Sequence, residues 1–372
     1  MKFLSSFFGY LSFLKLIKDK NSKKIVFFSE SKNYRNYLKK LIEALNEQPG
    51  IRLIYITSDL NDVEKITNNI SPIYIGNGFF RSLLFSLINC DMVIMTLTDL
   101  DNHEIKKSKF CKNYVYIFHS LASTHKCYTK EAFKNYDIIL SNGDYQKKEL
   151  EIAEKIFNFK KKKIFNTGYL YLEELLKEKS LNSNKNKVLF APSWNNSIKN
   201  LFNDYAEKII EKLMEKNFKT ILRTHPETAK RSSKILKKIV KKFSNNVNFE
   251  LNSDLRNLNT LNESSILITD NGGMALEYII IQRKPVLYID YSEKIHNKYF
   301  DNFQTETFED RVKKDIGTTI SVKELDKIDF FLNQAKSNFP KNSNRIDKLL
   351  TEFGVIMDNQ AQNNKNVILK LL

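Results

Sequence analysis

The sequence predicts an α/β protein of two Rossmann-like, doubly wound domains with a central cleft. The chain has 372 residues, and at about 150 residues per domain that length favours two domains. Hydrophobic residues make up 42% and aromatic residues 12%, enough for sizeable cores, which excludes a wholly disordered chain. Short apolar runs alternate with helical patterns, and this cycle occurs twice, as expected for two parallel-sheet units.

The first element is a basic, apolar helix over residues 1–22. Residues 3–17 are strongly apolar, but this stretch is shorter than the roughly 20 residues that span a bilayer, and no signal-peptide cleavage site follows. On a helix, one face carries Phe3, Phe7, Tyr10, Leu14 and Ile17, and lysines follow at once. The pattern is typical of a helix docked on anionic lipid through residues 1–24. Packing on the protein's own first domain is the alternative.

The next elements form an N-terminal domain over residues 23–180. Compact apolar runs of the kind found in buried parallel strands lie at 24–29, 51–57, 91–96, 114–119, 136–141 and 163–168. Helical patterns lie between several of them, at 33–47, 79–89 and 144–157. A polar stretch without glycine, 177–187, is the best domain boundary.

The cycle restarts in a C-terminal domain over residues 187–372. Strands are expected at 187–193, 219–225, 247–251, 265–270 and 284–290, and helices at 200–216, 228–243 and 273–282. Residues 323–371 read as helices that pack back across the domains. In such folds ligands bind at the carboxyl ends of the strands.

Charge and cysteine content limit the partners. The net charge is +17, which favours polyanionic partners, although surface lysine without a function explains it equally well. The lysine runs lack interleaved aromatic residues, so no nucleic acid is expected. Three cysteines without a CxxC pair exclude a disulfide scaffold and fit the reducing cytosol. Asp99 and Asp101 read as helix-start caps, and no metal site is expected.

The loop after the strand at 114–119 is the first candidate site. His119 and Ser120 are followed closely by Ser123, Thr124 and His125. Two histidines among hydroxyl side chains suit acid–base chemistry or phosphate binding. A capping loop whose histidines only satisfy backbone groups is the alternative.

Two further strand ends carry polar groups. Ser193 precedes Trp194, the only tryptophan, which suits either a nucleotide contact or core packing. Arg223, Thr224 and His225 precede Pro226, which fits the first position of a helix. Arg223 can neutralise a diphosphate, and His225 can donate a hydrogen bond or a proton to it. A surface arginine and a capping histidine are the alternative.

The strongest local pattern is the strand end Asp270, Asn271, Gly272 and Gly273, which opens a helix containing Glu277. Backbone N–H groups at such a turn suit a phosphate, and glycine lets it approach closely. Glu277 lies one turn further on, where a carboxylate can reach ribose hydroxyls. An ordinary tight turn is the alternative. The motif is neither GxGxxG nor a Walker loop, so it supports neither a dinucleotide dehydrogenase nor a P-loop ATPase.

Taken in order, these segments resemble the CDP-glycerol glycerophosphotransferase family, whose members build teichoic-acid-like and capsular polymers of the cell envelope. The resemblance covers roughly residues 90–295 and rests on FHSLASTH with AFKNYD, NTGYLYLEELL, LFAPSW, LRTHP and ITDNGGMALEYIIIQRKPVLY. It implies the glycosyltransferase-B architecture, with His119 assisting the acceptor and His225 at the donor phosphates. The family's usual Tyr/Ser-Ser turn is here Asn271, Gly272 and Gly273, its frequent Asp is Glu277, and its His-Gly pair is His119-Ser120.

The resemblance further implies a transferase that moves glycerol phosphate, or a similar alcohol phosphate, from a CDP-activated donor to a hydroxyl of a glycan or polyol-phosphate acceptor, releasing CMP. It implies no cofactor, and a cytoplasmic protein peripheral on the inner face of the membrane. Two alternatives stay open: a nucleotide-sugar glycosyltransferase or epimerase of the same fold, and a non-enzymatic basic binder of membranes or nucleic acid.

Overall fold

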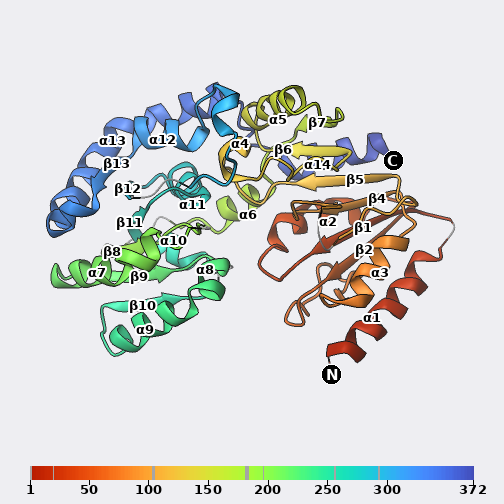
Figure 1. Cartoon of the computed structure of the whole chain (residues 1–372), viewed down its shortest axis with the longest axis horizontal. Coiled ribbons are helices and arrows are strands. Elements are labelled where there is room, and N and C mark those ends of the chain that lie inside the picture. Colours follow the sequence, from red (N-terminus) through yellow and green to blue (C-terminus); the bar gives the residue numbers. More distant parts are fainter. Residues whose placement is uncertain are drawn as a thin grey trace. The chain divides into compact units, whose positions relative to one another are not determined.

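A computed structural model describes residues 2–19, 21–102, 105–180, 184–195, 197–254, 257–291 and 294–372 (Figure 1). The chain divides into two compact units. The first unit comprises Met1–His119, Tyr128–Glu174 and Gly354–Leu372, and the second comprises Ser120–Cys127 and Leu175–Phe353. Both are α/β units with parallel sheets, as the sequence predicts.

The unit ranges differ from the expected domains in three places. Residues 120–127 lie in the second unit although they precede the boundary, and residues 354–372 lie in the first unit although they follow it. The main part of the second unit also begins at Leu175, inside the domain expected to end at residue 180. The reason is packing. The short helix α4 (Thr124–Cys127) bonds to residues 296–310, while α14 (Gln360–Leu371) buries Ile368 against the core of the first unit.

The first unit is built on a seven-stranded sheet in which every neighbouring pair is parallel. In spatial order the strands are β3 (Ile73–Tyr74), β2 (Ile51–Thr57), β1 (Lys23–Ser29), β4 (Met92–Met95), β5 (Asn113–Ile117), β6 (Ile138–Ser141) and β7 (Lys163–Asn166). Its helices include α1 (Lys2–Ile17), α2 (Asn36–Asn46), α3 (Phe79–Leu87), α5 (Asp144–Ile156) and α14, and α6 (Tyr171–Lys177) runs across the unit boundary. The central strands are buried on both faces, which explains their continuous apolar runs.

Helix α1 packs on its own unit with part of the face that the sequence assigned to lipid. Phe13 is buried in the core, with Tyr10, Leu14 and Ile17 packed beside it. A Cβ added at Gly9 would lie 1.8 Å from the carbonyl oxygen of Tyr74, so only glycine lets this helix pass so close to β3. Tyr10, Leu14 and Ile17 of that face are therefore packed on the protein, whereas Phe3 and Phe7 of the same face are 67% and 37% exposed. The other exposed large apolar side chains of α1 are Leu4, Phe8, Leu11 and Leu16.

The second unit is built on a six-stranded, all-parallel sheet. In spatial order its strands are β10 (Phe249–Asn252), β9 (Lys219–Arg223), β8 (Asn184–Phe190), β11 (Ser264–Thr269), β12 (Val286–Asp290) and β13 (Thr318–Ser321). Its helices are α4, α7 (Leu201–Glu215), α8 (Pro226–Arg231), α9 (Ser233–Phe243), α10 (Asn259–Glu263), α11 (Gly273–Glu277), α12 (Phe308–Ile316) and α13 (Ile328–Glu352). Shorter helical segments are η1 (Tyr278–Gln282), η2 (Phe300–Phe303) and η3 (Val322–Lys327).

Several local expectations need correction. The helix expected over 228–243 is two helices, α8 and α9, with Ser232 between them. Two short edge strands, β3 and β13, had no counterpart in the sequence reading. Asp99 and Asp101 do not cap a helix: both have positive φ values, of 62° and 65°, in a connection that the Asp99 amide ties to the Ala132 carbonyl.

Candidate functional site

Three neighbouring strands of the second unit end at one edge of its sheet. The order β9, β8, β11 is contiguous and parallel. The connections that follow these strands therefore share that edge, and they carry the segments Arg223–His225, Ser193–Trp194 and Asp270–Gly273. The structure thus brings together the donor-side groups that the sequence singled out, at the place where parallel sheets bind ligands.

Asp270 ties two of these connections together. It is 2% exposed, and its Oδ1 accepts a hydrogen bond of 2.7 Å from the backbone N–H of Ser193. Beside it, the Thr269 hydroxyl donates to the Ala191 carbonyl at 2.7 Å. Burial raises the pKa of the Asp270 carboxyl, while bonds from backbone N–H groups oppose that rise. Asp270 therefore acts as a positioning residue that fixes Ser193 against the glycine turn.

The glycine turn opens α11 in the way the sequence predicts, with Gly272 in an extended conformation before the first helical residue. A Cβ at Gly273 would lie 2.3 Å from Oγ of Ser120, closer than real Cβ atoms come to another heavy atom. Glycine thus lets the Ser120 hydroxyl lie against the start of the helix, and a larger residue would make that hydroxyl rotate away. The backbone N–H groups at this end of α11 are those that the sequence predicts for phosphate binding, and that role stays a prediction.

His225 caps helix α8, and this capping bond sets its tautomer. Its Nδ1 accepts a hydrogen bond of 3.1 Å from the backbone N–H of Glu227. A neutral imidazole whose Nδ1 accepts must carry its proton on Nε2. The capping alternative from the sequence is therefore present, and it places the ring proton on Nε2, the kind of donor that suits a phosphate oxygen.

An aromatic and imidazole cluster lies next to His225. The Trp194 ring stacks on the His225 ring at a centroid distance of 6.0 Å and meets the edge of His296 at 5.1 Å. The Arg231 guanidinium lies 5.7 Å from the centroid of the Trp194 ring. Trp194 thus belongs to the site and not to the apolar core.

His296 is a site residue that the sequence reasoning missed. Its Nδ1 lies 3.0 Å from the Cys127 carbonyl oxygen, so Nδ1 carries the proton and donates it. Burial, reinforced by the charge of Lys294, lowers the pKa of His296 to about 4. The available signal was its rarity, because the chain contains five histidines.

Arg223, Thr224 and Glu277 are more deeply buried than the sequence suggested. Arg223 is 4% exposed, and its Nη1 donates to the Asn257 carbonyl at 2.8 Å and to the Thr260 hydroxyl at 3.1 Å. These bonds make Arg223 hold the connection between β10 and α10. Thr224 and Glu277 are also buried. Direct contact of these three side chains with a donor stays a prediction.

The segment 120–127 is anchored inside the second unit. The Glu309 carboxylate accepts from the Ser123 N–H at 2.8 Å, and the Ser123 hydroxyl accepts from the Phe308 N–H at 2.8 Å. The His125 ring stacks on Phe303 at 5.0 Å, with its Nε2 3.2 Å from the Thr305 carbonyl oxygen. Ser123, Thr124 and His125 are all buried. The structure therefore favours the packing alternative for these residues, and a ligand role for them stays a prediction.

Two lysines that the sequence did not single out lie beside the glycine turn. A small pocket is lined by Asn271, Gly272, Lys126 and Lys294, together with Ala122, Cys127, Glu309 and Asp310. The Lys126 ammonium pairs with the Asp310 carboxylate at 2.8 Å. The Glu309 and Asp310 carboxylates belong to the same lining, so the two lysines are balanced by two carboxylates there.

His119 belongs to the first unit and lies among tyrosines. Tyr34, Tyr37 and Tyr128 approach its ring edge-on, at centroid distances of 5.3, 6.0 and 6.2 Å. The Tyr116 hydroxyl lies 3.5 Å from Nδ1. The residues after β1, with two tyrosines in the run SKNYRNY, were the sequence signal for this cluster.

Comparison with known proteins gives one family and one fold. A family described as CDP-glycerol:poly(glycerophosphate) glycerophosphotransferase matches residues 10–348. A structure of the wall teichoic acid polymerase TagF is similar at a TM-score of 0.60 and 16% identity, covering 99% of this chain and 97% of that one. A UDP-GlcNAc 2-epimerase from Neisseria meningitidis, bound to UDP-GlcNAc, is similar at 0.59 and 12% identity, covering 94% and 100%. The search of curated proteins found no match. Within the described ranges, no helix has the length and apolar character to cross a membrane.

Proposed function

The chain belongs to the CDP-glycerol:poly(glycerophosphate) glycerophosphotransferase family, and we propose that the β8–β9–β11 edge of its second unit binds the CDP-glycerol donor. The reaction is attack of an acceptor hydroxyl on the β-phosphorus. A new P–O bond forms, the bond to the bridging oxygen breaks, CMP leaves and the hydroxyl proton passes to a base. Such a reaction gains most from in-line positioning and from neutralisation of charge.

The observation that carries the donor site is the fixed tautomer of His225. Nδ1 accepts a hydrogen bond from the N–H of Glu227, so the ring proton is on Nε2. This Nε2–H donor lies on the side of the ring away from the helix cap. Toward a diphosphate it would donate a hydrogen bond as charge develops on the leaving CMP. The amides of the 271–273 turn, with Lys294 beside Asn271 and Gly272, would meet the remaining phosphate charge.

His119 is the proposed base toward the acceptor hydroxyl. Its ring is oriented by edge contacts to Tyr34, Tyr37 and Tyr128. Loss of a general base or acid typically lowers the rate by about 10²–10⁴. Glu277 is the proposed ribose ligand. The reaction is proposed to need no cofactor or metal, because the turn amides and the His225 Nε2–H would donate hydrogen bonds to the phosphate oxygens.

The test of the proposed reaction is CMP release from CDP-glycerol by the full chain, with nucleotide sugars as competing donors and EDTA in a parallel series. We expect CMP with CDP-glycerol, no UDP from UDP-sugars, and turnover that survives EDTA. The His119→Ala and His225→Asn variants should lose most turnover. UDP release without CMP release would instead support the sugar-transferring or epimerising alternative.

We further propose that α1 docks on an anionic membrane through its exposed apolar side chains, which include Phe3 from the face that the sequence suggested. Leu4 and Phe8 are 57% and 61% exposed, and Phe79 at the start of α3 is 67% exposed. Lys2, Lys15 and Lys18 flank this surface in the sequence. Exposed aromatic residues with neighbouring lysines suit insertion at the headgroup level of an anionic bilayer.

The membrane proposal predicts co-sedimentation with vesicles that contain phosphatidylglycerol and weak binding to purely phosphatidylcholine vesicles. The double variant Leu4→Ser/Phe8→Ser should lose binding. Phe330→Ser is the matched control, because Phe330 is also 61% exposed but lies on α13 of the second unit. Equal loss in both variants would refute a specific role for α1.

A further inference from the structure

A large pocket lies at the carboxyl ends of β1, β2 and β3 in the first unit. Its volume is about 790 Å³, within the range typical of small-molecule sites. Its walls come from the ends of these strands, from the first turns of α1 and from the start of α3. The polar lining residues are Lys2, Ser6, Glu30, Ser31, Ser58, Asp59, Asn61, Tyr74 and Asn77.

The charge of this pocket is opposite to that of the chain. Two carboxylates, Glu30 and Asp59, face it against one lysine, Lys2, in a protein of net charge +17. Carboxylates repel phosphate groups and accept hydrogen bonds from hydroxyls. The lining therefore disfavours a nucleotide or a polyol phosphate and favours a neutral molecule rich in hydroxyl groups.

The apolar part of the lining suits a sugar ring. Phe3, Phe79 and Phe80 contribute to the walls together with Tyr74. The rings of Phe3 and Phe80 lie 5.1 Å apart and those of Phe79 and Phe80 lie 5.5 Å apart. A single aromatic ring offers a flat apolar face to the C–H face of a sugar, while the polar lining groups take its hydroxyls.

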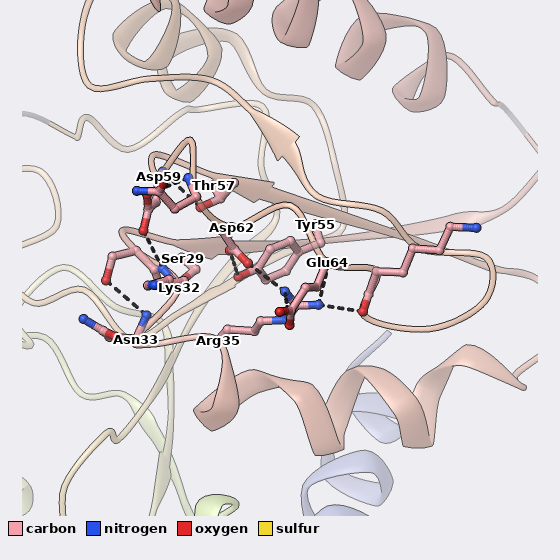
Figure 2. A network of polar contacts seen from close by, with 12 residues as sticks. Ser29, Lys32, Asn33, Arg35, Tyr55, Thr57, Asp59, Asp62 and Glu64 are labelled. Atoms are coloured by element: carbon pink, nitrogen blue, oxygen red, sulfur yellow. Dashed lines mark hydrogen bonds and ion pairs between the residues drawn. The ribbon is translucent and has the colours of Figure 1, made fainter. Parts of the chain in front are cut away.

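The polar rim is held in place before any ligand arrives. Asp59 accepts from the N–H groups of Asn61 at 2.9 Å and Lys32 at 3.1 Å, and the Ser58 hydroxyl donates to the Gly76 carbonyl at 2.8 Å. Figure 2 shows the network at the ends of β1 and β2 that includes these Asp59 bonds.

A buried ion pair between Arg35 and Asp62 links the segments that follow β1 and β2. Arg35 donates to Asp62 at 2.9 Å and also to the carbonyls of Glu64 and Lys65, while the Tyr55 hydroxyl donates to Asp62 at 2.7 Å (Figure 2). Arg35 and Asp62 are 5% and 2% exposed. Such a satisfied network holds the 30–35 and 58–65 segments in one arrangement.

One chain segment both lines this pocket and contacts His119, the proposed base. Glu30 and Ser31 line it, and the same segment continues to Tyr34, whose ring is 5.3 Å from that of His119. The opposite rim carries Phe3 and Phe79, which belong to the surface proposed to meet the membrane. An acceptor held here would have its lipid end near α1 and its sugar end on the side of Tyr34.

We propose that this pocket binds a neutral sugar of a membrane-anchored acceptor, so that the acceptor of this transferase presents a sugar hydroxyl and not a polyol-phosphate end. This inference deepens the proposed function and rests on it for the identity of the reaction. The binding step itself can be measured without turnover.

The experiment compares two acceptors with the same alkyl chain, dodecyl maltoside below its micellar concentration and dodecyl glycerol phosphate. Binding to the full chain is followed by saturation-transfer NMR, and turnover by CMP release from CDP-glycerol. We expect binding and turnover with the maltoside. The Asn77→Ala and Phe79→Ala variants should each weaken the maltoside by about tenfold and leave the KM for CDP-glycerol unchanged.

A charge variant tests selectivity directly. Glu30→Lys should weaken the maltoside and strengthen the glycerol phosphate, while Phe330→Ala, on the second unit, should change neither. Preference of the wild-type protein for dodecyl glycerol phosphate, or unchanged maltoside binding in Asn77→Ala and Phe79→Ala, would overturn the inference. Failure of the proposed function is a different result: no CDP-glycerol binding and no CMP with either acceptor.

Discussion

Acidification should destabilise the second unit through His296. In the folded protein its pKa is about 4, below the ordinary value of 6.5, because the ring is partly buried and Lys294 is close. Between these two pH values the unfolded chain takes up a proton that the folded chain does not. The stabilising contribution of neutral His296 is therefore complete above about pH 6.5 and is lost as the pH falls toward 4.

The size of the expected loss in the free energy of unfolding follows from the same two pKa values. One pKa unit corresponds to about 1.36 kcal/mol, so the difference between 6.5 and about 4 sets an upper limit of about 3 kcal/mol. The ring is only partly buried, and solvent screening lowers the expected loss to about 1–2 kcal/mol. The comparison variant is His296→Asn, whose side-chain amide can still donate to the Cys127 carbonyl but does not titrate.

Trp194 makes this measurable, since it is the only tryptophan and its ring lies 5.1 Å from that of His296. Urea unfolding of the full chain, followed by Trp194 emission at pH 7 and pH 5, should show a larger acid loss in the wild type than in His296→Asn. The Trp194 emission of the folded protein should also change with a midpoint near pH 4, as His296 takes up its proton. The same titration in a His225→Gln background removes the contribution of the second imidazole beside Trp194. Equal acid losses in the two proteins would refute the argument from burial.

Three other substitutions test the site and the fold. Gly273→Ala should lower CMP release because its Cβ would lie 2.3 Å from Ser120 Oγ and would make that hydroxyl rotate away, and Gly273→Ala/Ser120→Gly should recover it; a double variant no more active than the single one would contradict this reason. His225→Asn should keep the α8 cap and the stability, whereas His225→Ala should also lower the free energy of unfolding by about 1 kcal/mol; the capping role fails if both variants unfold alike. Asp62→Ala should cost about 3–5 kcal/mol because it strands the buried Arg35, while Asp19→Ala, at an exposed pair with Arg52, should hardly change stability; similar losses would show that burial of the pair is unimportant.

Much of the architecture was predictable because parallel strands buried on both faces leave a strong pattern. The runs around Val26, Ile94 and Leu267 are apolar throughout, and each forms a central strand. The short edge strands β3 and β13 were not predicted because two to four residues leave no clear period. The glycine turn was recognisable because Gly-Gly after an apolar strand has few other uses.

The site was predictable as a set of strand ends but not as a set of contacts. Nothing in the local sequence shows that Arg223 turns to Asn257, or that His125 stacks on Phe303. Those two contacts depend on residues that are 34 and 178 positions away in the chain. His296 was missed for the same reason: its bond to the Cys127 carbonyl spans 169 positions.

The path of the chain constrains how this protein can be made. Ile368 completes a core that begins with Ile25, and Asn364 bonds to Thr167 at 2.9 Å, so the first unit needs the last residues to be synthesised. The segment 120–127, which the ribosome releases early, must wait for Phe308 and Glu309. Neither half can therefore finish folding before the other has been translated, and a fragment cut near residue 180 would lack part of its interior.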